Sequence, residues 1–312
     1  MTGFAFVFPG QGSQAVGMLD AWGDNVAVRQ TLAEASDALG EDMARLIREG
    51  PKEQLDLTSN TQPVMLTAGM ACYRAWMAQT GLQPALLAGH SLGEYTALVA
   101  AGSLSLTDAL PLVRFRAQAM QDAVPVGVGA MAAILGLDAE EVRQGCAEAA
   151  AASGETVAAA NFNDPKQTVI AGTRAGVDKA CEVLKARGAK RALQLAVSAP
   201  FHSILMKPAA ERLKERLAAT RFSSPSIPVL NNVDVAVQTE TAAIRDALYR
   251  QAFGPVRWVE LVQAIRACGL THIIECGPGK TLAGMVKRID AQTVAGHVLD
   301  PATLDQVREL LA

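Results

Sequence analysis

A single serine stands between two glycines in the segment Gly89-His90-Ser91-Leu92-Gly93. The apolar residues 84–89 before it have the pattern of a buried strand, and residues 92–101 after it have the pattern of a helix. A serine on a sharp turn between a strand and a helix can be held exposed and strained, so that it acts as a nucleophile. The pattern therefore predicts nucleophilic catalysis at Ser91, and a tight turn without chemistry is the alternative.

A serine nucleophile needs a base, and the chain has four histidines. Neighbouring side chains at a strand end point to opposite faces, so we expect His90 to be a packed residue. His272 and His297 lie in apolar strand patterns, which favours structural roles. His202 begins a predicted helix where two predicted domains meet and clefts form, so it is the candidate base, with a partly buried helix-start residue as the alternative. No carboxylate follows His202 closely, and a backbone carbonyl or an amide side chain would orient its imidazole.

The composition of the 312-residue chain argues against several classes of function. Half of the residues are hydrophobic and the net charge is −3, which leaves no electrostatic footprint for nucleic acid or a membrane surface. No stretch reaches the roughly 18 apolar residues of a membrane span, and the N-terminal segment has no basic region typical of signal peptides. The five cysteines are scattered and no Cys/His cluster occurs. We therefore expect reduced thiols, no metal site and a cytoplasmic protein.

Two glycine-rich turns resemble nucleotide-binding loops but lack required features. The turn Gly10-Gln11-Gly12 follows a strand, yet a helical pattern stands where a dinucleotide site needs a second strand with an acidic end. The second turn, residues 275–281, matches the end of a phosphate-binding loop. Such a loop needs its first glycine at position 274, where this chain has Ile274. Both segments are interpreted as turns, and no bound cofactor is predicted.

The periodicity of apolar residues predicts nine strands and ten helices. The predicted strands are 4–8, 84–89, 130–137, 156–162, 167–172, 190–197, 227–231, 271–276 and 293–298. The predicted helices are about 26–39, 61–79, 92–101, 105–122, 138–151, 174–187, 203–219, 240–252, 256–268 and 280–289.

The order of these elements predicts an α/β fold in two parts. Strands and helices alternate at both ends of the chain, which is typical of a mainly parallel sheet covered by helices. In the middle, the order is strand, helix, strand, strand, helix, strand, which is the ferredoxin-like order. We therefore expect a larger domain of residues 1–126 and 198–312 and a small inserted domain of residues 127–197.

The predicted helix 105–122 carries two arginines beside its apolar stripe. The stripe consists of Leu106, Leu110, Val113, Ala117 and Met120. Arg114 and Arg116 flank it about equally, and an arginine in such a place is usually solvated. The residues alone do not choose between the two.

Eight motifs occur in an order that identifies a family. They are FVFPGQGSQ, GHSLGEYTALVAAG, RFRAQAM, AANFNDP, FHSILMKPA, LNNVDV, RQAFGPVRW and ECGPGKTLAGMVKRI. Over nearly its whole length the chain closely resembles the malonyl-CoA:acyl carrier protein transacylases of bacterial fatty-acid synthesis. It is similar, less completely, to the acyltransferase domains of polyketide synthases. The resemblance implies an α/β-hydrolase-like larger domain.

The resemblance also implies roles for residues in these motifs. Ser91 would be acylated, with His202 as its base. The backbone N–H groups of Gln11 and Leu92 would form the oxyanion hole. The implied substrate-binding residues are Arg116 for the malonyl carboxylate, Gln251 in the region where a hydrolase triad has its acid, Asn161 near the acyl pocket, and Phe201, which goes with malonyl selection in related polyketide acyltransferases.

The implied activity is a ping-pong transfer of the malonyl group from malonyl-CoA to the phosphopantetheine thiol of an acyl carrier protein. Coenzyme A and phosphopantetheine would enter as parts of substrates, no cofactor is needed, and we expect a monomer. Alternatives are a malonyltransferase of a malonate decarboxylase or a polyketide pathway, and a serine hydrolase or thioesterase. A non-catalytic carrier-protein binding module is disfavoured, since the chain has both Ser91 and His202.

Overall fold

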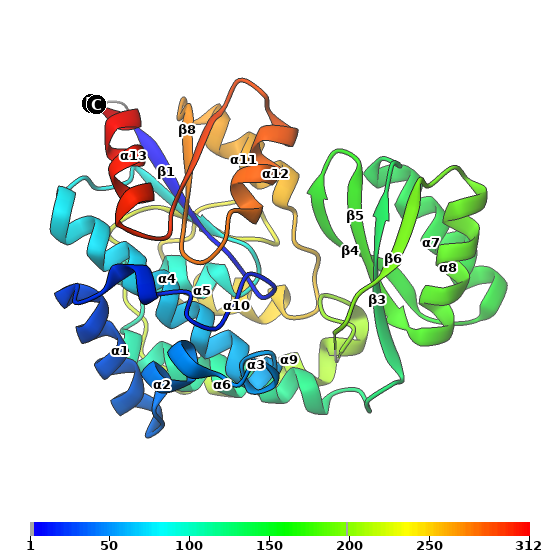
Figure 1. The fold of residues 1–312 in the computed structure, drawn as a ribbon. Helices are drawn as coiled ribbons and strands as arrows, with labels where there is room; N and C mark the ends of the chain where they lie inside the picture. Colours follow the sequence, from blue (N-terminus) through cyan, green and yellow to red (C-terminus); the bar gives the residue numbers. More distant parts are fainter. Residues whose placement is uncertain (1–2, 198) are drawn as a thin grey trace.

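Two separate β-sheets organise the computed structural model, which describes residues 3–197 and 199–312 (Figure 1). The first has five parallel strands in the order β7-β2-β1-β8-β9, and the second has four antiparallel strands in the order β4-β5-β3-β6. The parallel sheet consists of β1 (Phe4–Phe8), β2 (Leu86–Gly89), β7 (Val229–Leu230), β8 (His272–Cys276) and β9 (Val294–Val298). The antiparallel sheet consists of β3 (Gly129–Leu135), β4 (Val157–Asp164), β5 (Gln167–Thr173) and β6 (Arg191–Gln194). The mixed α/β fold with a ferredoxin-like second sheet is as predicted.

Helices cover both faces of the parallel sheet, so its strands are apolar on both sides. Phe4, Phe6 and Phe8 of β1 belong to a core shared with α4, α5, α6, α9 and α13, whereas Ala5 and Val7 pack with α11 and α12. The helices are α1 (Val26–Leu39), α2 (Met43–Glu49), α3 (Lys52–Leu55), α4 (Thr58–Thr80), α5 (Gly93–Ala100), α6 (Leu106–Asp122), α7 (Ala139–Ser153), α8 (Arg174–Ala186), α9 (Lys207–Ala219), α10 (Thr241–Gln251), α11 (Trp258–Ala267), α12 (Thr281–Ile289) and α13 (Pro301–Leu311), with short 3-10 turns η1 (Asp20–Trp22) and η2 (Ile204–Met206).

The antiparallel sheet has helices on one face only. Ala130, Ala132 and Ile134 of β3 pack with α7 and α8, while Met131 and Ala133 point to the opposite face. Figure 1 shows this sheet with α7 and α8 as a lobe beside the parallel sheet. The predicted domain boundaries stay a prediction, and Ser198, one of the boundary residues, lies outside the described residues.

Several predicted element bounds differ from the structure. The predicted strands 190–197 and 227–231 are shorter, as β6 and β7, and both are edge strands with few partners. Strand β4 continues through Asp164, so the turn to β5 contains only Pro165 and Lys166. Helices α2, α3 and α13 were not predicted. The signal for α13 was present, because Asp300 caps the helix and Pro301 occupies its first turn.

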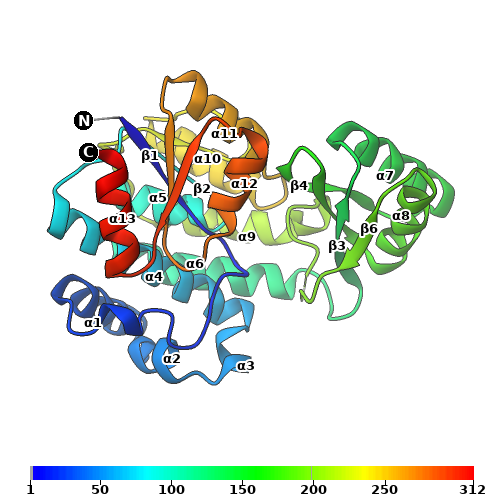
Figure 2. The same cartoon turned by 45° about the horizontal axis from the view of Figure 1, so that its top comes forward.

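The turn from β2 to α5 leaves no space for side chains at its two glycines. A β-carbon on Gly89 would lie 1.9 Å from the carbonyl carbon of Gly93, and one on Gly93 would lie 2.0 Å from the carbonyl oxygen of Phe8. Ser91 between them has a φ of 53°, in the left-handed region that few side chains adopt. Strands β1 and β2 run side by side toward this turn (Figure 2). The spacing of the two glycines thus follows from close backbone packing.

Backbone hydrogen bonds between β4 and the residue before α11 join the lobes of the two sheets. The N–H of Val256, just before α11, donates to Ala160 O at 2.9 Å, and the N–H of Phe162 donates to Val256 O at 2.9 Å. Arg288 of α12 pairs with the buried carboxylate of Asp164 at 2.7 Å. These contacts hold β4 against the larger lobe.

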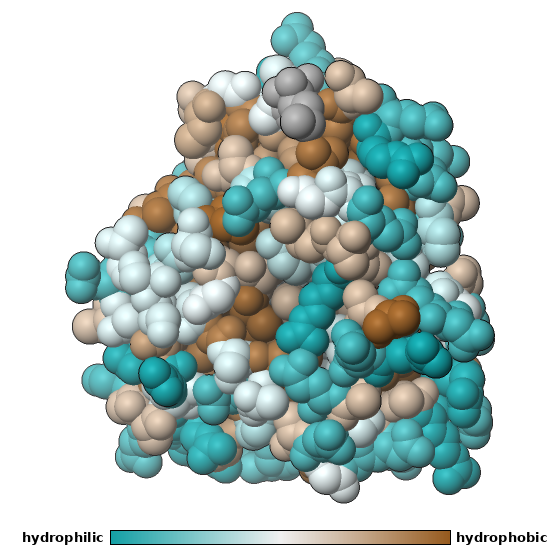
Figure 3. All heavy atoms as spheres, turned by 90° about the vertical axis from the view of Figure 1, so that its left-hand side faces the viewer, coloured by the Kyte–Doolittle hydropathy of each residue, from teal (hydrophilic) through white to brown (hydrophobic). Residues whose placement is uncertain are grey.

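Hydrophilic side chains cover most of the face formed by the left-hand side of Figure 1, with apolar side chains in smaller separate groups (Figure 3). Within residues 3–197 and 199–312, no helix combines the length and apolarity that a membrane crossing requires.

We predict that Gly93→Ala lowers the free energy of unfolding by at least about 3 kcal/mol or prevents folding, because the added methyl meets backbone and not a movable side chain. Gly284→Ala in α12 is the matched control. Its β-carbon meets only the end of Arg288 at 3.4 Å, so we expect a change of at most about 1 kcal/mol, toward greater stability. Urea unfolding followed by circular dichroism measures both, and equal stabilities would contradict the steric account.

Candidate active site

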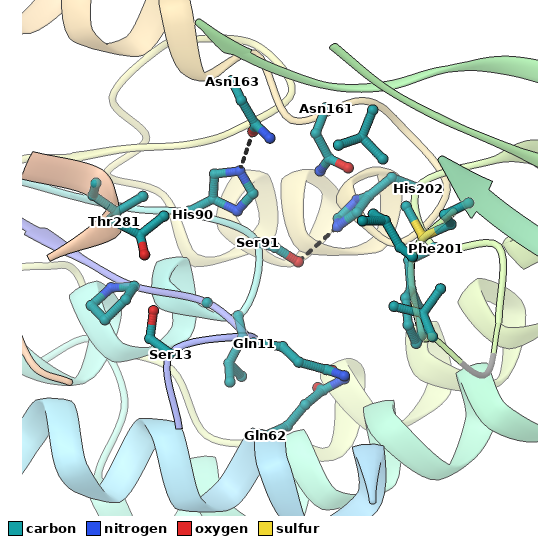
Figure 4. Close-up of a pocket in the computed structure, with 18 of the residues that line it drawn as sticks. Gln11, Ser13, Gln62, His90, Ser91, Asn161, Asn163, Phe201, His202 and Thr281 are labelled. Carbon is teal, nitrogen blue, oxygen red and sulfur yellow. Dashed lines mark hydrogen bonds between the residues drawn. The ribbon is translucent and has the colours of Figure 1, made fainter. Parts of the chain in front are cut away.

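A cavity of about 220 Å³ opens between the parallel sheet and the helix-free face of the antiparallel sheet. Its polar floor comes from the loop after β1, the turn after β2, and helices α4 and α6, and its apolar wall comes from β3, β5 and the segment after β6. The predicted site residues that line it are Gln11, Ser91, Leu92, Arg116, Asn161, Phe201 and His202. Predicted residues from five distant parts of the sequence therefore meet in one place (Figure 4).

Ser91 and His202 form a hydrogen-bonded pair at the centre of this cavity. The Ser91 Oγ lies 2.7 Å from His202 Nε2, and the two side chains point toward one another (Figure 4). His202 also has a left-handed backbone, with a φ of 59°, and is 5% exposed. Strained backbone at both partners is typical of a site in which position matters more than local stability.

Two backbone carbonyls orient the imidazole. His202 Nδ1 lies 3.0 Å from Gln251 O and 3.1 Å from Gly254 O. Because a carbonyl can only accept, Nδ1 carries the proton, and Nε2 keeps its lone pair toward the hydroxyl of Ser91. Of the two orienting groups that the sequence left open, the structure has the backbone carbonyl. A charge-neutral partner thus stands where a hydrolase has its acid.

The surroundings of His202 disfavour its protonated form. Burial, followed by the electrostatic effects of Arg116 and His90, lowers the pKa of His202 to about 3, against the two carbonyl hydrogen bonds. The imidazole is therefore neutral at physiological pH and free to accept a proton from Ser91.

Two residues that line the cavity, Gln11 and Leu92, have backbone N–H groups without a hydrogen-bond acceptor among the described residues. Leu92 is the N-cap of α5, so its N–H belongs to the positive end of a helix dipole. Gln11 lies in the exposed turn after β1 and also lines the cavity. Unpaired N–H groups at the edge of a cavity can bind an oxyanion, so both stay candidates for that role.

Arg116 is a buried cation without an acidic partner. Its side chain from α6 is 2% exposed and donates to Gln62 Oε1 at 2.8 Å, Gln251 Oε1 at 3.0 Å and Ser91 Oγ at 3.2 Å. The guanidinium also lies over the ring of Tyr95, at 5.4 Å. Within the described residues it makes no ion pair, and its Nε has no acceptor. Such a charge beside a nucleophile favours binding of an anionic substrate group.

The two arginines of α6 have opposite environments. Arg114 points outward and donates through both terminal nitrogens to the Glu41 carboxylate at 2.8 Å. Arg116 lies under α4 and α5, next to Ser91. Helices α4 and α5 cover the side of α6 that carries Arg116. The apolar periodicity of α6 does not show this cover, so the sequence of α6 alone does not tell which arginine is buried.

The remaining predicted residues take different places around the cavity. Phe201 is half-buried in the apolar wall, and Asn161 of β4 is buried at its edge. Gln251 is fully buried and lies outside the cavity lining, where its side chain holds Arg116. His90 turns toward Asn163, with 2.9 Å between Nε2 and Oδ1, so it is packed and does not contact Ser91 Oγ (Figure 4).

Sequence reasoning missed several residues that build the site. Gln62 is the last residue of the polar start of α4, just before its apolar run, and no local pattern set it apart. Asn232 follows β7 and accepts from the Ser91 N–H at 2.7 Å while donating to Gly89 O at 2.7 Å. Its motif, LNNVDV, was recognised without a role for any residue. Asn163 holds His90, and no local pattern indicated that contact.

Among the described residues, no three His, Cys, Asp or Glu side chains come together as a metal site requires. The turn at Gln11 and the loop before α12 both border the cavity, where Ser13 and Thr281 contribute hydroxyls.

Comparison with known proteins places this geometry in a family. The family model described as acyl transferase domain matches residues 5–299. The malonyl CoA-acyl carrier protein transacylase of Salmonella typhimurium is 52% identical over 305 residues, covering 97% of this chain and 98% of the relative. That of Bacillus subtilis is 47% identical over 306 residues, covering 98% and 96%. The chain belongs to the family of malonyl-CoA:acyl carrier protein transacylases.

Solved structures of this transacylase family match the whole fold. The acyl-carrier-protein S-malonyltransferase of Burkholderia pseudomallei superposes with a TM-score of 0.97 at 64% identity, covering 99% of this chain and 100% of that one. A malonyl-transacylase in complex with a type II PKS acyl-carrier protein superposes with a TM-score of 0.97 at 48% identity, covering 99% and 100%. The arrangement of two sheets around one cavity is therefore that of transacylases of known structure.

The lowered pKa of His202 predicts how a serine-directed reagent labels this transacylase. With phenylmethylsulfonyl fluoride, the labelling rate of Ser91 should stay level from pH 8 to pH 5, because His202 becomes protonated only near pH 3. An imidazole with an ordinary pKa near 6.5 would lose about 30-fold over that interval. Intact-mass spectrometry measures the rate, Ser91→Ala shows that the label is on Ser91, and a decline centred near pH 6.5 would contradict the prediction.

Proposed function

We propose that this chain transfers the malonyl group from malonyl-CoA to the phosphopantetheine thiol of an acyl carrier protein, through a malonyl ester on Ser91. The observation that carries the proposal is Arg116, a buried guanidinium without an acidic partner, 3.2 Å from Ser91 Oγ. A malonyl ester on Ser91 would bring a free carboxylate to this cation. Fork-like pairing of the two is strong and selective for planar carboxylates.

Acylation begins with the Ser91–His202 pair. His202 Nε2 takes the hydroxyl proton as Ser91 Oγ attacks the thioester carbonyl carbon. The oxygen of the tetrahedral intermediate accepts hydrogen bonds from the N–H groups of Gln11 and Leu92, and one such donor is typically worth about 3 kcal/mol. The carbon–sulfur bond then breaks, and His202 returns the proton to the leaving thiolate of coenzyme A.

The second half-reaction uses the same groups with a new nucleophile. The carrier thiol gives its proton to His202 and attacks the malonyl ester, and the second oxyanion forms in the same place. The ester bond to Ser91 Oγ breaks and His202 reprotonates the serine. The acceptor thus enters only after coenzyme A has left, which is a ping-pong order.

The malonyl carboxylate also adjusts the base. The positive charge of Arg116 disfavours protonated His202, and both groups lie within hydrogen-bond distance of Ser91 Oγ. A carboxylate paired with Arg116 cancels much of this repulsion, so His202 becomes a stronger base when a diacid thioester is bound. Neutral acyl groups leave the guanidinium unpaired and the base weak, so selection acts on reaction rate as well as on binding.

A serine hydrolase is the main alternative, since it shares the strand-turn-helix arrangement of the nucleophile. The carbonyl partners of His202 and the unpaired Arg116 fit a diacyl transferase better. The proposed chemistry fits a carrier protein of fatty-acid synthesis, of a polyketide pathway or of a malonate decarboxylase equally well. The solved complex with a type II PKS acyl-carrier protein makes such a carrier worth testing beside one of fatty-acid synthesis.

We further propose that the protein acts as a cytoplasmic monomer without a bound cofactor. Every residue with a proposed role comes from one chain, and the five cysteines are free, as in a reducing compartment. The division into residues 1–126 with 198–312 and 127–197 is part of this proposal, as is Phe201 as a residue that narrows the pocket against a methyl branch. Competition between malonyl-CoA and methylmalonyl-CoA in Phe201→Ser would measure that last role.

Incubation with malonyl-CoA tests the proposed nucleophile. We expect a stable malonyl adduct on the wild-type protein that added carrier protein discharges, and no adduct on Ser91→Ala, because the Ser91 hydroxyl is the group that contacts the basic nitrogen, Nε2, of His202. Intact-mass spectrometry follows the adduct. An adduct on Ser91→Ala would identify another nucleophile, and rapid release of free malonate without carrier would indicate hydrolysis.

Substitution of the two arginines tests the carboxylate site. Arg116→Ala should lower kcat/KM for malonyl-CoA by at least about 30-fold relative to acetyl-CoA, because removing one partner of a buried charge pair costs about 2–5 kcal/mol. Arg114→Ala removes a surface ion pair and should change the ratio less than about 3-fold. A preserved malonyl preference in Arg116→Ala, with loss in Arg114→Ala, would reverse the assignment.

A further inference from the structure

Glu94 is a buried acid for which the proposed mechanism has no use. It is the second residue of α5, three positions after Ser91, and is 2% exposed. Burial raises its pKa to about 7, while hydrogen bonds from Gln251 and Asn232 and the charge of Arg116 favour its carboxylate form. An acid kept in the interior without an ion pair needs an explanation.

Glu94 defines the orientation of the Gln251 side chain. The two N–H bonds of Gln251 Nε2 point to Glu94 Oε2 at 3.0 Å and to the Ser91 carbonyl at 2.9 Å. Gln251 Oε1 accepts from Arg116 at 3.0 Å. A backbone carbonyl and a carboxylate can only accept, and a guanidinium can only donate. All three bonds are satisfied only when the amide nitrogen faces Glu94 and the amide oxygen faces Arg116.

The same carboxylate oxygen also holds the turn that carries the serine. Glu94 Oε2 accepts from the backbone N–H of Asn232 at 2.8 Å. The Asn232 side chain accepts from the N–H of Ser91 and donates to the carbonyl of Gly89. Asn232 and Gln251 are both fully buried. One oxygen atom therefore ties together the Ser91 turn and the amide that holds Arg116.

We propose that Glu94 is a positioning residue that sets the selectivity for malonyl groups by orienting Gln251 and, through it, Arg116. Without this acceptor, the Gln251 amide loses one of the two bonds that direct its oxygen to Arg116. The guanidinium then loses a fixed partner and forms its fork with a carboxylate less often. Gln251 also contributes the carbonyl that orients His202, but this carbonyl is backbone and does not depend on the amide. The inference rests on the proposed malonyl transfer.

The test is the ratio of kcat/KM for malonyl-CoA to kcat/KM for acetyl-CoA. The ratio does not change with the fraction of folded enzyme, so a purely structural role of Glu94 leaves it unaltered. In Glu94→Met we expect it to fall about 10-fold, as for a lost hydrogen bond to a charged group. In Glu94→Gln, which keeps an oxygen for the Gln251 and Asn232 N–H groups, we expect it to stay within about 3-fold of wild type.

Glu275 provides a matched control. Glu275 is a fully buried glutamate, and burial raises its pKa to about 7, as for Glu94. It accepts a hydrogen bond from the backbone N–H of Ala283 in α12 and makes none with Arg116, Gln251 or Ser91. Glu275→Met should leave the ratio unchanged even where it destabilises the protein. If Glu94→Met does not fold, Glu94→Asp decides, because the shorter side chain withdraws the carboxylate from Gln251 and should lower the ratio likewise.

Two results separate this inference from the proposed function. A wild-type enzyme without malonyl preference would overturn malonyl transfer itself. A wild-type preference that persists in Glu94→Met or Glu94→Asp, with both thioesters slowed equally, would overturn the positioning role alone. A ratio that falls as far in Glu275→Met as in Glu94→Met would also overturn it.

Discussion

Strand β2, helix α5 and the end of β1 approach so closely that backbone atoms occupy the space of a β-carbon at Gly89 and Gly93. This contact forces the chain to reverse within three residues and holds Ser91 at a positive φ. The reversal brings the hydroxyl, which stands at the start of α5, to His202. The position of the serine and the helix dipole behind it thus share one origin in backbone packing.

The base and the cation of the site are both held in place without an acid in contact with either. His202 is oriented by carbonyls, and Arg116 by the oxygens of two glutamines. Neutral partners fix the geometry of both groups but do not cancel a charge. The site therefore has a fixed shape and an unbalanced positive charge, which the carboxylate of a malonyl group would balance in the proposed reaction.

The sequence predicted the elements that local patterns determine. Strands with continuous apolar runs, the Ser91 turn and the ferredoxin-like order follow from short-range periodicity, and the motifs singled out the residues that now line the cavity. It could not choose between Arg114 and Arg116, because burial on α6 depends on how α4 and α5 cover it. Glu94, Asn232 and Gln62 also escaped, since their partners lie far away in the sequence. The predicted strand 190–197 is longer than the edge strand β6, because apolar residues continue beyond Gln194, the last residue of β6 that pairs with β3.

The backbone bonds between Val256 and β4 have a consequence for protein engineering. They set the spacing between the lobes with peptide groups, which substitutions do not remove. The depth of the acyl pocket, in contrast, depends on side chains of the helix-free face, such as Met131 and Val169. Room for a bulkier acyl group could therefore be made by replacing these side chains with smaller ones, one at a time. The hydrogen bonds that join the lobes would stay in place.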